Sequence, residues 1–338
     1  MTNRLNIGII GAGRIGRVHA ENLAYRIPAA RTLVIADVQG QAASEVAHRL
    51  GIPKATARYE EVLSNPEIQA VLVCSSTETH AAITGQAASA GKHVFCEKPI
   101  AHSLGEIDKA LEAVEKARVK LQVGFNRRFD ANFRRVRQAI ESGEIGEPSL
   151  MHIVSRDPSP PPLDYIRVSG GMFLDMTIHD FDMARYLIGD EVTEIYALAG
   201  VRIDPAIKAA EDVDTALVTL KFAHGVIGTI DNSRRASYGY DQRVEVLGSK
   251  GSISTLNNYA NQAIVSDARS VRRDLPLNFF MDRYTESFVN EVSMFVEAIL
   301  RDKPVPVNGH DGRVPVAMAL AAGRSFREGR PVRLSEIC

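Results

Sequence analysis

A glycine-rich segment near the start of the chain constrains the fold more than any other feature. The segment GAGRIG, residues 11–16, directly follows an apolar run at Leu5–Ile10 and opens a helical pattern. In such a segment the first glycine permits a tight turn, the second lets the backbone approach a pyrophosphate, and the third allows close helix–strand packing. The N–H groups that begin the helix then face the phosphates. The segment predicts a dinucleotide site that includes Gly11, Gly13, Arg14 and Ile15.

Asp37 indicates which dinucleotide is bound. It directly follows the second strand-like run, Thr32–Ala36, about 20 residues after the glycines. A carboxylate at this point can accept hydrogen bonds from both ribose hydroxyls, and it repels a 2′-phosphate. We therefore expect NAD rather than NADP. An aspartate that flanks a helix and binds no ligand is the structural alternative.

The first third of the chain alternates short apolar runs with helical patterns. Strands are predicted at Leu5–Ile10, Thr32–Ala36, Val71–Cys74, His93–Cys96 and Leu121–Gly124. The helices between them are predicted at Arg14–Tyr25, Gln41–Leu50, Glu78–Ala90 and Leu104–Arg118. Strands that are apolar almost throughout and are separated by helices predict a parallel sheet covered on both faces. We expect an α/β fold whose residues 1–125 form a doubly wound Rossmann domain that binds NAD.

The pattern changes after residue 125. Helices are predicted at Asp130–Ile140, Met176–Leu187, Asp282–Leu300 and Gly312–Arg327, and strand-like runs at Ser149–Arg156, Glu194–Val201, Asp214–Phe222, Val226–Asn232, Gln242–Leu247 and Ser252–Thr255. Turn signals between consecutive strands favour antiparallel pairing. Residues 126–338 are therefore expected to form an α/β domain with a large open, mostly antiparallel sheet. We assign substrate binding and oligomer formation to this domain. The helix at 312–327 is expected to pack back on the first domain.

Composition excludes several classes of function. The 338 residues include 40 Lys and Arg against 41 Asp and Glu, a formal net charge of −1, which does not support binding to nucleic acid or to an anionic membrane. No apolar stretch approaches the roughly 18 residues of a membrane span. Met1-Thr2-Asn3 leads straight into a strand, so no signal peptide is evident. Cys74, Cys96 and Cys338 lack metal-type spacing, and we expect no metal, buried thiols at the first two, and a cytoplasmic protein.

Two further segments carry reactive side chains. Lys98 lies in Cys-Glu-Lys-Pro at the end of a strand, where open α/β sheets bind ligands. Asp175 and His179 are four residues apart at a predicted helix start and would share one face. A lysine, an aspartate and a histidine around a nicotinamide suit removal of a proton and a hydride from an alcohol. Taken singly, Asp175 could be a helix cap and His179 a structural histidine; Asp180 and Asp182 are expected to be capping or solvated charges.

These segments resemble the glucose–fructose oxidoreductase / inositol dehydrogenase / MocA (Gfo/Idh/MocA) family over essentially the whole chain. The resemblance rests on GAGRIG, CEKP, GFNRRFD and DMTIHDFDMARYL, and SRDPSPPP with SGGMFLDMTIHDFDMAR is similar to bacterial inositol 2-dehydrogenases. It implies a Rossmann domain joined to an α/β domain, a homotetramer, and NAD-dependent oxidation of the 2-hydroxyl of myo-inositol to the keto-inositol. Lys98, Asp175 and His179 match the catalytic residues of the family, with His179 as general base. A cis bond before Pro99 is usual in the family.

The remaining candidate residues are assigned to cofactor or substrate. Cofactor contacts are expected, beside the glycine segment and Asp37, from Ser75, Thr77, His80, Glu97, Lys98 and Asn126, with a structural histidine as the alternative for His80. Substrate contacts are expected from Lys98, Arg127, Asp157, Asp175, His179 and Tyr240. A turn role competes for Asp157, and a surface aromatic for Tyr240.

One residue departs from the family pattern. Many inositol dehydrogenases have a tyrosine where this chain has Phe288, so one hydroxyl contact to a polyol is expected to be missing. The alternative functions are an NAD-dependent dehydrogenase of another polyol or a glucose-like sugar, and a non-catalytic NAD-sensing regulator. The presence of Lys98, Asp175 and His179 argues against the regulator.

Overall fold

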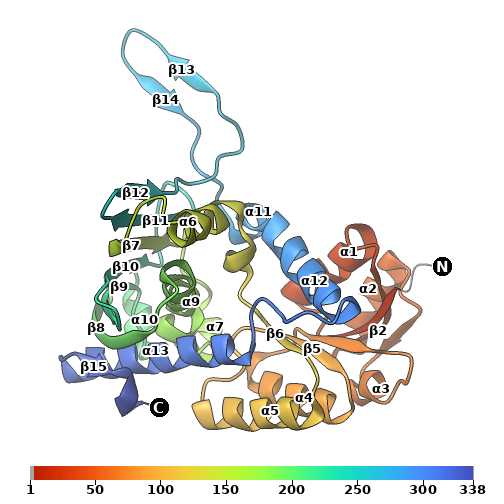
Figure 1. Cartoon of the computed structure of the whole chain (residues 1–338). Coiled ribbons are helices and arrows are strands. Elements are labelled where there is room, and N and C mark those ends of the chain that lie inside the picture. The colour runs from red at the N-terminus through yellow and green to blue at the C-terminus, as the bar shows by residue number, and fades with distance from the viewer. Residues whose placement is uncertain (1–3, 338) are drawn as a thin grey trace. The chain divides into compact units, whose positions relative to one another are not determined.

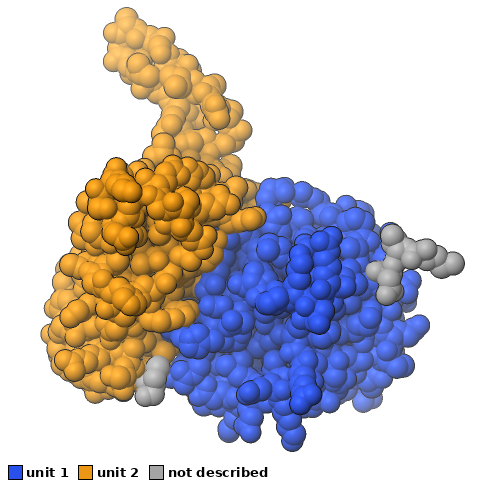
Figure 2. Space-filling view, viewed as in Figure 1, with its two compact units in different colours: residues 1–129, 286–316 blue, residues 130–285, 317–338 orange. Residues whose placement is uncertain are grey.

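The computed structural model describes residues 4–337, which divide into two compact units. Unit 1 comprises the chain up to Phe129 and the later segment Glu286–Val316. Unit 2 comprises Asp130–Thr285 and the chain from Ala317 onward (Figure 2). Residues 1–3, on which the expectation about the N-terminus rests, and Cys338 lie outside the described residues.

Each unit therefore consists of two stretches that are separate in the sequence. The ranges 1–125 and 126–338 remain a sequence-based prediction of functional domains. Helix α13 (Gly309–Glu328), which contains the predicted helix at 312–327, begins in unit 1 and continues in unit 2. None of the helices within residues 4–337 is long and apolar enough to span a membrane.

Unit 1 contains a six-stranded parallel sheet in the order β3-β2-β1-β4-β5-β6, which confirms the predicted doubly wound fold (Figure 1). The strands are β1 (Leu5–Ile10), β2 (Ala30–Ala36), β3 (Lys54–Thr56), β4 (Ala70–Val73), β5 (His93–Glu97) and β6 (Leu121–Gly124). The helices are α1 (Arg14–Tyr25), α2 (Gly40–Leu50), α3 (Glu60–Leu63), α4 (Thr77–Ser89) and α5 (Leu104–Ala117), and η1 (Asn126–Phe129) is a 3₁₀ turn. The order of strands reverses between β1 and β4, the point at which such sheets bind nucleotides.

A helix from late in the chain completes the core of unit 1. Helix α12 (Thr285–Leu300) lies with α1 and α2 on one face of the sheet, and α4 and α5 lie on the other (Figure 1). The side chains of Val292 and Phe295 are fully buried in the same apolar cluster as Leu5, Ile7 and Ile9 of β1. The predicted helix at 282–300 is divided in the structure, because α11 (Phe280–Arg283) ends before α12 begins.

Unit 2 contains a seven-stranded sheet in the order β12-β11-β7-β10-β9-β8-β15. Only β7 and β10 pair in parallel, so the predicted mostly antiparallel sheet is confirmed. The strands are β7 (Pro148–Arg156), β8 (Val192–Gly200), β9 (Thr215–Phe222), β10 (Ile227–Ser233), β11 (Asp241–Gly248), β12 (Gly251–Ser254) and β15 (Val332–Arg333). The remaining helices are α6 (Ala131–Glu141), α7 (Leu163–Val168), α8 (Met172–Asp175), α9 (Thr177–Ile188), α10 (Pro205–Ala209) and the 3₁₀ turn η2 (Leu334–Glu336).

A two-stranded hairpin leaves the body of unit 2 between β12 and α11. It pairs β13 (Ile264–Ser266) with β14 (Val271–Arg273), and every residue of both strands is exposed (Figure 1). A hairpin of this length has no core of its own, and it was not among the strands predicted from the sequence.

Candidate functional site

The glycine segment forms the turn between β1 and α1. Gly11 has a φ of +106°, and a Cβ atom added there would lie 2.4 Å from the carbonyl oxygen of Cys74. A Cβ on Gly16 would lie 2.0 Å from the carbonyl oxygen of Gly11. Gly13, the N-cap of α1, has no neighbour within 4 Å of an added Cβ and no side chain that caps the helix. The structure therefore leaves open space beside the helix N-terminus, which fits a pyrophosphate.

Asp37 is held against this turn. One carboxylate oxygen accepts a hydrogen bond from the backbone N–H of Ala12 at 2.7 Å, and the other accepts from Gln39 at 2.8 Å. The next residue, Val38, is 89% exposed. These contacts place a carboxylate beside the glycine turn, as recognition of a ribose requires.

His80 joins two loops at the same edge of the sheet. Its Nδ1 lies 2.9 Å from the carbonyl oxygen of Pro99, and its Nε2 lies 3.0 Å from that of Ser75. A carbonyl only accepts, so both hydrogen bonds form together only in the imidazolium. Burial alone lowers the pKa of this histidine, but the neighbouring Cys96 and the two carbonyls outweigh it and raise the pKa to about 9. The structure thus holds a buried cation where the loops after β4 and β5 meet.

Glu97 is the last residue of β5, and Lys98 follows it directly. The bond between Lys98 and Pro99 is cis, as the family resemblance implied. The Glu97 side chain is 14% exposed and meets Nε2 of His19 at 2.6 Å. Asn126 and Arg127 lie in η1 directly after β6 and are both buried.

The parallel sheet brings most of the predicted cofactor residues to one edge, because the carboxyl ends of parallel strands lie together. Five of them lie at or just after the ends of five strands: Gly11 after β1, Asp37 after β2, Ser75 after β4, Glu97 in β5 and Asn126 after β6. Arg14 and Ile15 lie in the first turn of α1, and Thr77 begins α4.

Unit 2 holds Asp175 and His179. Asp175 ends α8 and His179 lies in the first turn of α9, so a break at Met176 separates the two predicted helix neighbours. Tyr165 donates its hydroxyl hydrogen to Oδ1 of Asp175 at 2.8 Å, and Nη1 of Arg234 lies 3.4 Å from Oδ2.

Arg234 was not predicted. Its side chain is 1% exposed and faces both Asp175 and Asp212, whose Oδ2 lies 3.5 Å from Nη2. A guanidinium buried between two carboxylates offsets their charge. Neither Arg234 nor Tyr165 stands in a sequence motif with Asp175, because both reach it through tertiary contacts.

Three other sequence expectations can be placed. Tyr240 is buried and packs edge-on against the ring of Tyr284, so the surface-aromatic alternative is wrong. Asp180 and Asp182 are buried as well, so they are not solvated charges; Asp180 accepts a hydrogen bond from Asn232 at 2.9 Å.

Asp157 follows β7 and is half-buried. Its backbone N–H donates to Ser233 and its carbonyl accepts from Ala236. Phe288, the departure from the family pattern, lies in unit 1, where its ring meets the His19 ring edge-on at 6.1 Å.

Two parts of the chain match known families. Residues 5–125 match the oxidoreductase family with an NAD-binding Rossmann fold, and residues 133–254 match the GFO/IDH/MocA C-terminal domain.

Full-length relatives extend this similarity. The chain is 48% identical to myo-inositol 2-dehydrogenase of Thermotoga maritima over 98% of this chain and 99% of that protein. It is 44% identical to inositol 2-dehydrogenase of Rhizobium meliloti over 98% of this chain and 99% of that protein.

Solved structures agree. A probable dehydrogenase from Thermotoga maritima matches with a TM-score of 0.97 and 48% identity, covering 99% of this chain and 100% of that one. The scyllo-inositol dehydrogenase of Lactobacillus casei, solved with bound NAD(H) and scyllo-inositol, matches with a TM-score of 0.92 and 28% identity, covering 98% and 99% of the two chains. With the glycine turn and Asp37 in place, these similarities establish that the chain belongs to the Gfo/Idh/MocA family and is an NAD-binding oxidoreductase.

Proposed function

We propose that this enzyme oxidises the 2-hydroxyl of myo-inositol to the keto-inositol with NAD. The observation that carries the proposal is 48% identity, over nearly the full length of both chains, to a myo-inositol 2-dehydrogenase. The chain also retains the three residue types that the chemistry needs, at Lys98, Asp175 and His179.

The reaction removes a proton and a hydride from one carbinol, and each can be assigned. NAD, when bound, accepts the hydride from the carbinol carbon. An imidazole nitrogen of His179 takes the hydroxyl proton, because a histidine titrates near neutral pH. Lys98 donates a hydrogen bond to the same oxygen and stabilises its developing negative charge. The products are the ketone, NADH and the proton held by His179.

Asp175 orients this machinery in the proposal. Its carboxylate accepts from Tyr165 and faces the buried guanidinium of Arg234, which together restrict its rotation. A fixed carboxylate can orient the imidazole and stabilise its protonated form, or accept a hydrogen bond from a neighbouring hydroxyl of the polyol.

The proposal also assigns the binding residues. A polyol needs a hydrogen-bond donor or acceptor for each buried hydroxyl, and side chains of both charges can provide them. The proposed substrate-binding residues are Lys98, Arg127, Asp157, Asp175, His179 and Tyr240. The NAD set comprises Gly11, Gly13, Arg14, Ile15, Asp37, Ser75, Thr77, His80, Glu97, Lys98 and Asn126.

NADH formation with a panel of cyclic polyols tests the function. Myo-inositol should give a higher kcat/KM than glucose, galactose or xylose, because a site built for hydroxyls rejects analogues that leave its own polar groups unpaired. A sugar whose kcat/KM exceeds that of myo-inositol by about tenfold would show that the sugar is the substrate. The assignment as an NAD-dependent dehydrogenase would still hold. NAD binding without turnover on any polyol would favour the regulator.

We further propose that the enzyme is a homotetramer assembled through the sheet of unit 2. The outer face of this sheet carries aliphatic side chains that are 42–55% exposed, at Leu150, Leu198, Leu217, Ile227 and Leu247. Leu150 pairs in register with both Ile227 and Leu247, so these three lie side by side. An exposed apolar face of this kind is typical of a symmetric subunit interface.

Light scattering tests the assembly. The wild-type chain should give about four times the monomer mass of 36.9 kDa, and Ile227→Glu should lower the mass. A wild-type protein that runs as a monomer would refute the proposal. We also propose a cytoplasmic location, supported by the free, buried thiols of Cys74 and Cys96.

A further inference from the structure

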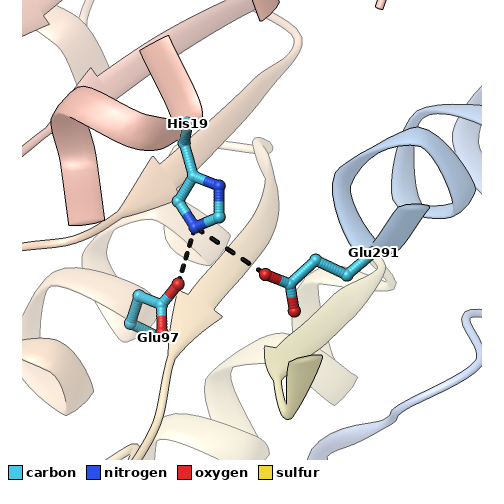
Figure 3. A group of neighbouring side chains, drawn as sticks. All are labelled: His19, Glu97 and Glu291. Atoms are coloured by element: carbon cyan, nitrogen blue, oxygen red, sulfur yellow. Dashed lines mark hydrogen bonds and ion pairs between the residues drawn. The ribbon is translucent and has the colours of Figure 1, made fainter. Parts of the chain in front are cut away.

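A buried cluster of three titratable side chains lies in unit 1, outside the proposed catalytic trio. His19 on α1, Glu97 at the end of β5 and Glu291 on α12 point toward one another (Figure 3). Nε2 of His19 lies 2.6 Å from Oε1 of Glu97 and 3.9 Å from Oε1 of Glu291. The cluster therefore joins the helix that follows the glycine turn, the strand that leads into Lys98, and the helix that returns late in the chain.

The surroundings of the cluster are apolar. The His19 side chain is fully buried and meets the rings of Phe95 at 5.3 Å and Phe288 at 6.1 Å, both edge-on. Glu291 is also fully buried, and neither of its carboxylate oxygens has a hydrogen-bond partner within residues 4–337. In the described part of the chain, no lysine or arginine pairs with either glutamate of the cluster.

These contacts determine where the protons lie. The 2.6 Å contact between Nε2 of His19 and Oε1 of Glu97 is a hydrogen bond, in which we assign Nε2 as the donor and the carboxylate as the acceptor. A second ionised carboxylate so close, in an apolar site without a lysine or arginine, would be very unfavourable. Burial and the charge of Glu97 raise the pKa of Glu291 well above its ordinary value, so Glu291 remains neutral.

Two thiols, those of Cys74 and Cys96, lie near the cluster. The pKa of Cys74, after β4, is raised by burial and by Glu97, Cys96 and Glu291, so this thiol adds no charge at neutral pH. The cluster then holds its only full negative charge on Glu97.

The distances disfavour a metal ion as the alternative occupant. Two ligand atoms on one metal, each about 2.0–2.2 Å from it, lie roughly 3 Å or more apart. The separation of 2.6 Å between His19 and Glu97 is that of a hydrogen bond.

We propose that His19 is a positioning residue, which holds the Glu97 carboxylate in one place and thereby fixes the backbone that carries Lys98. Glu97 is confined on its other side as well, since a Cβ on Gly124 of β6 would lie 3.0 Å from its Oε2. The inference rests on the proposed function, in which Lys98 contacts the reacting oxygen.

Kinetics of single and double variants test the coupling. Glu97→Gln and His19→Leu should each lower kcat by about 10- to 100-fold, because small misplacements of a catalytic group have effects of that size. KM for myo-inositol should change less than about threefold in both variants. In His19→Leu, which replaces a residue outside the proposed NAD and substrate sets, the Kd of NAD should also change less than about threefold. His19→Gln should recover part of the loss, because its amide can donate to Glu97. The double variant of His19→Leu and Glu97→Gln should be no worse than the poorer single one.

A matched surface change serves as the control. Glu286 lies on the same helix as Glu291, but it is exposed and pairs with Arg26. Glu286→Gln should therefore leave kcat unchanged. Losses that multiply in the double variant, or a Glu97→Gln enzyme with wild-type kcat, would overturn the positioning role.

The protonation of Glu291 has a readout that needs no turnover. A carboxyl that stays neutral in the folded chain but ionises in the unfolded chain lowers stability as pH rises above about 4.5. Glu291→Gln removes this penalty. The melting temperature of the variant relative to wild type should therefore rise steadily from pH 5.5 to pH 8.5.

The outcomes separate this inference from the proposed function. An enzyme inactive on inositol would refute the function and leave the melting result standing. A pH-independent difference in melting temperature would refute the neutral Glu291. Stoichiometric zinc or manganese that is present in the purified protein and lost in His19→Leu would show that the cluster is a metal site. It would overturn the hydrogen-bonded arrangement proposed here.

Discussion

The charge on His80 should appear as a pH-dependent part of the folding free energy. The folded pKa is about 9, against an ordinary value near 6.5. The difference of about 2.5 units at 1.36 kcal/mol each corresponds to about 3 kcal/mol. Because the folded pKa is raised, this stability is fully present below about pH 6.5 and is lost as pH rises through about 9.

Replacing His80 with Gln removes this contribution. We expect the variant to be less stable than wild type near pH 6, and the difference in free energy of unfolding to shrink by about 3 kcal/mol by about pH 9.5. Urea unfolding of both proteins at three pH values between these limits measures it. His48→Gln, in an exposed position on α2, is the matched control and should show a constant difference.

Two results would refute this reasoning. One is a difference between wild type and His80→Gln that stays constant with pH. The other is a nitrogen NMR spectrum of labelled histidines in which His80 is neutral at pH 7.5, since its two carbonyl partners require N–H on both ring nitrogens.

The remaining predictions concern the proposed base, the cofactor and the glycine turn. His179→Ala should lower kcat/KM by about 10²- to 10⁴-fold with little change in NAD affinity measured by titration, and near wild-type turnover would remove His179 from the mechanism. Asp37→Ser with Val38→Arg should raise kcat/KM for NADP relative to NAD, and an unchanged ratio would contradict the role of Asp37. Gly16→Ala should give little folded protein, because its Cβ would meet a backbone oxygen at 2.0 Å. Gly13→Ala should fold with a wild-type circular dichroism spectrum but bind NAD more weakly, because its Cβ would enter the open space beside the helix.

Features encoded by neighbouring residues could be predicted from the sequence. The glycine turn, the Asp37 carboxylate and the β-branched strands of unit 1 each depend on a few consecutive side chains, and the structure has them where the patterns indicated. The strand Lys54–Thr56 was missed because three residues, only one of them apolar, carry no periodic signal.

Features that depend on tertiary contacts could not be predicted. The partners of Asp175 come from separate segments, with Arg234 lying 59 residues away in the chain. The charge on His80 depends on two carbonyl groups that only the folded sheet brings to its ring. Burial of Asp180 likewise follows from its contact with Asn232 in a strand 52 residues later.

The return of α12 into the core of unit 1 has a consequence during synthesis. Residues 1–129 leave the ribosome with Leu5, Ile7 and Ile9 on a sheet face that Val292 and Phe295 cover only about 160 residues later. At roughly 5–20 residues per second, this delay lasts about 10 to 30 seconds. For that interval the nascent nucleotide-binding half displays an apolar surface of the kind that chaperones bind. Newly made chains therefore reach a complete nucleotide-binding core only after most of unit 2 has been translated.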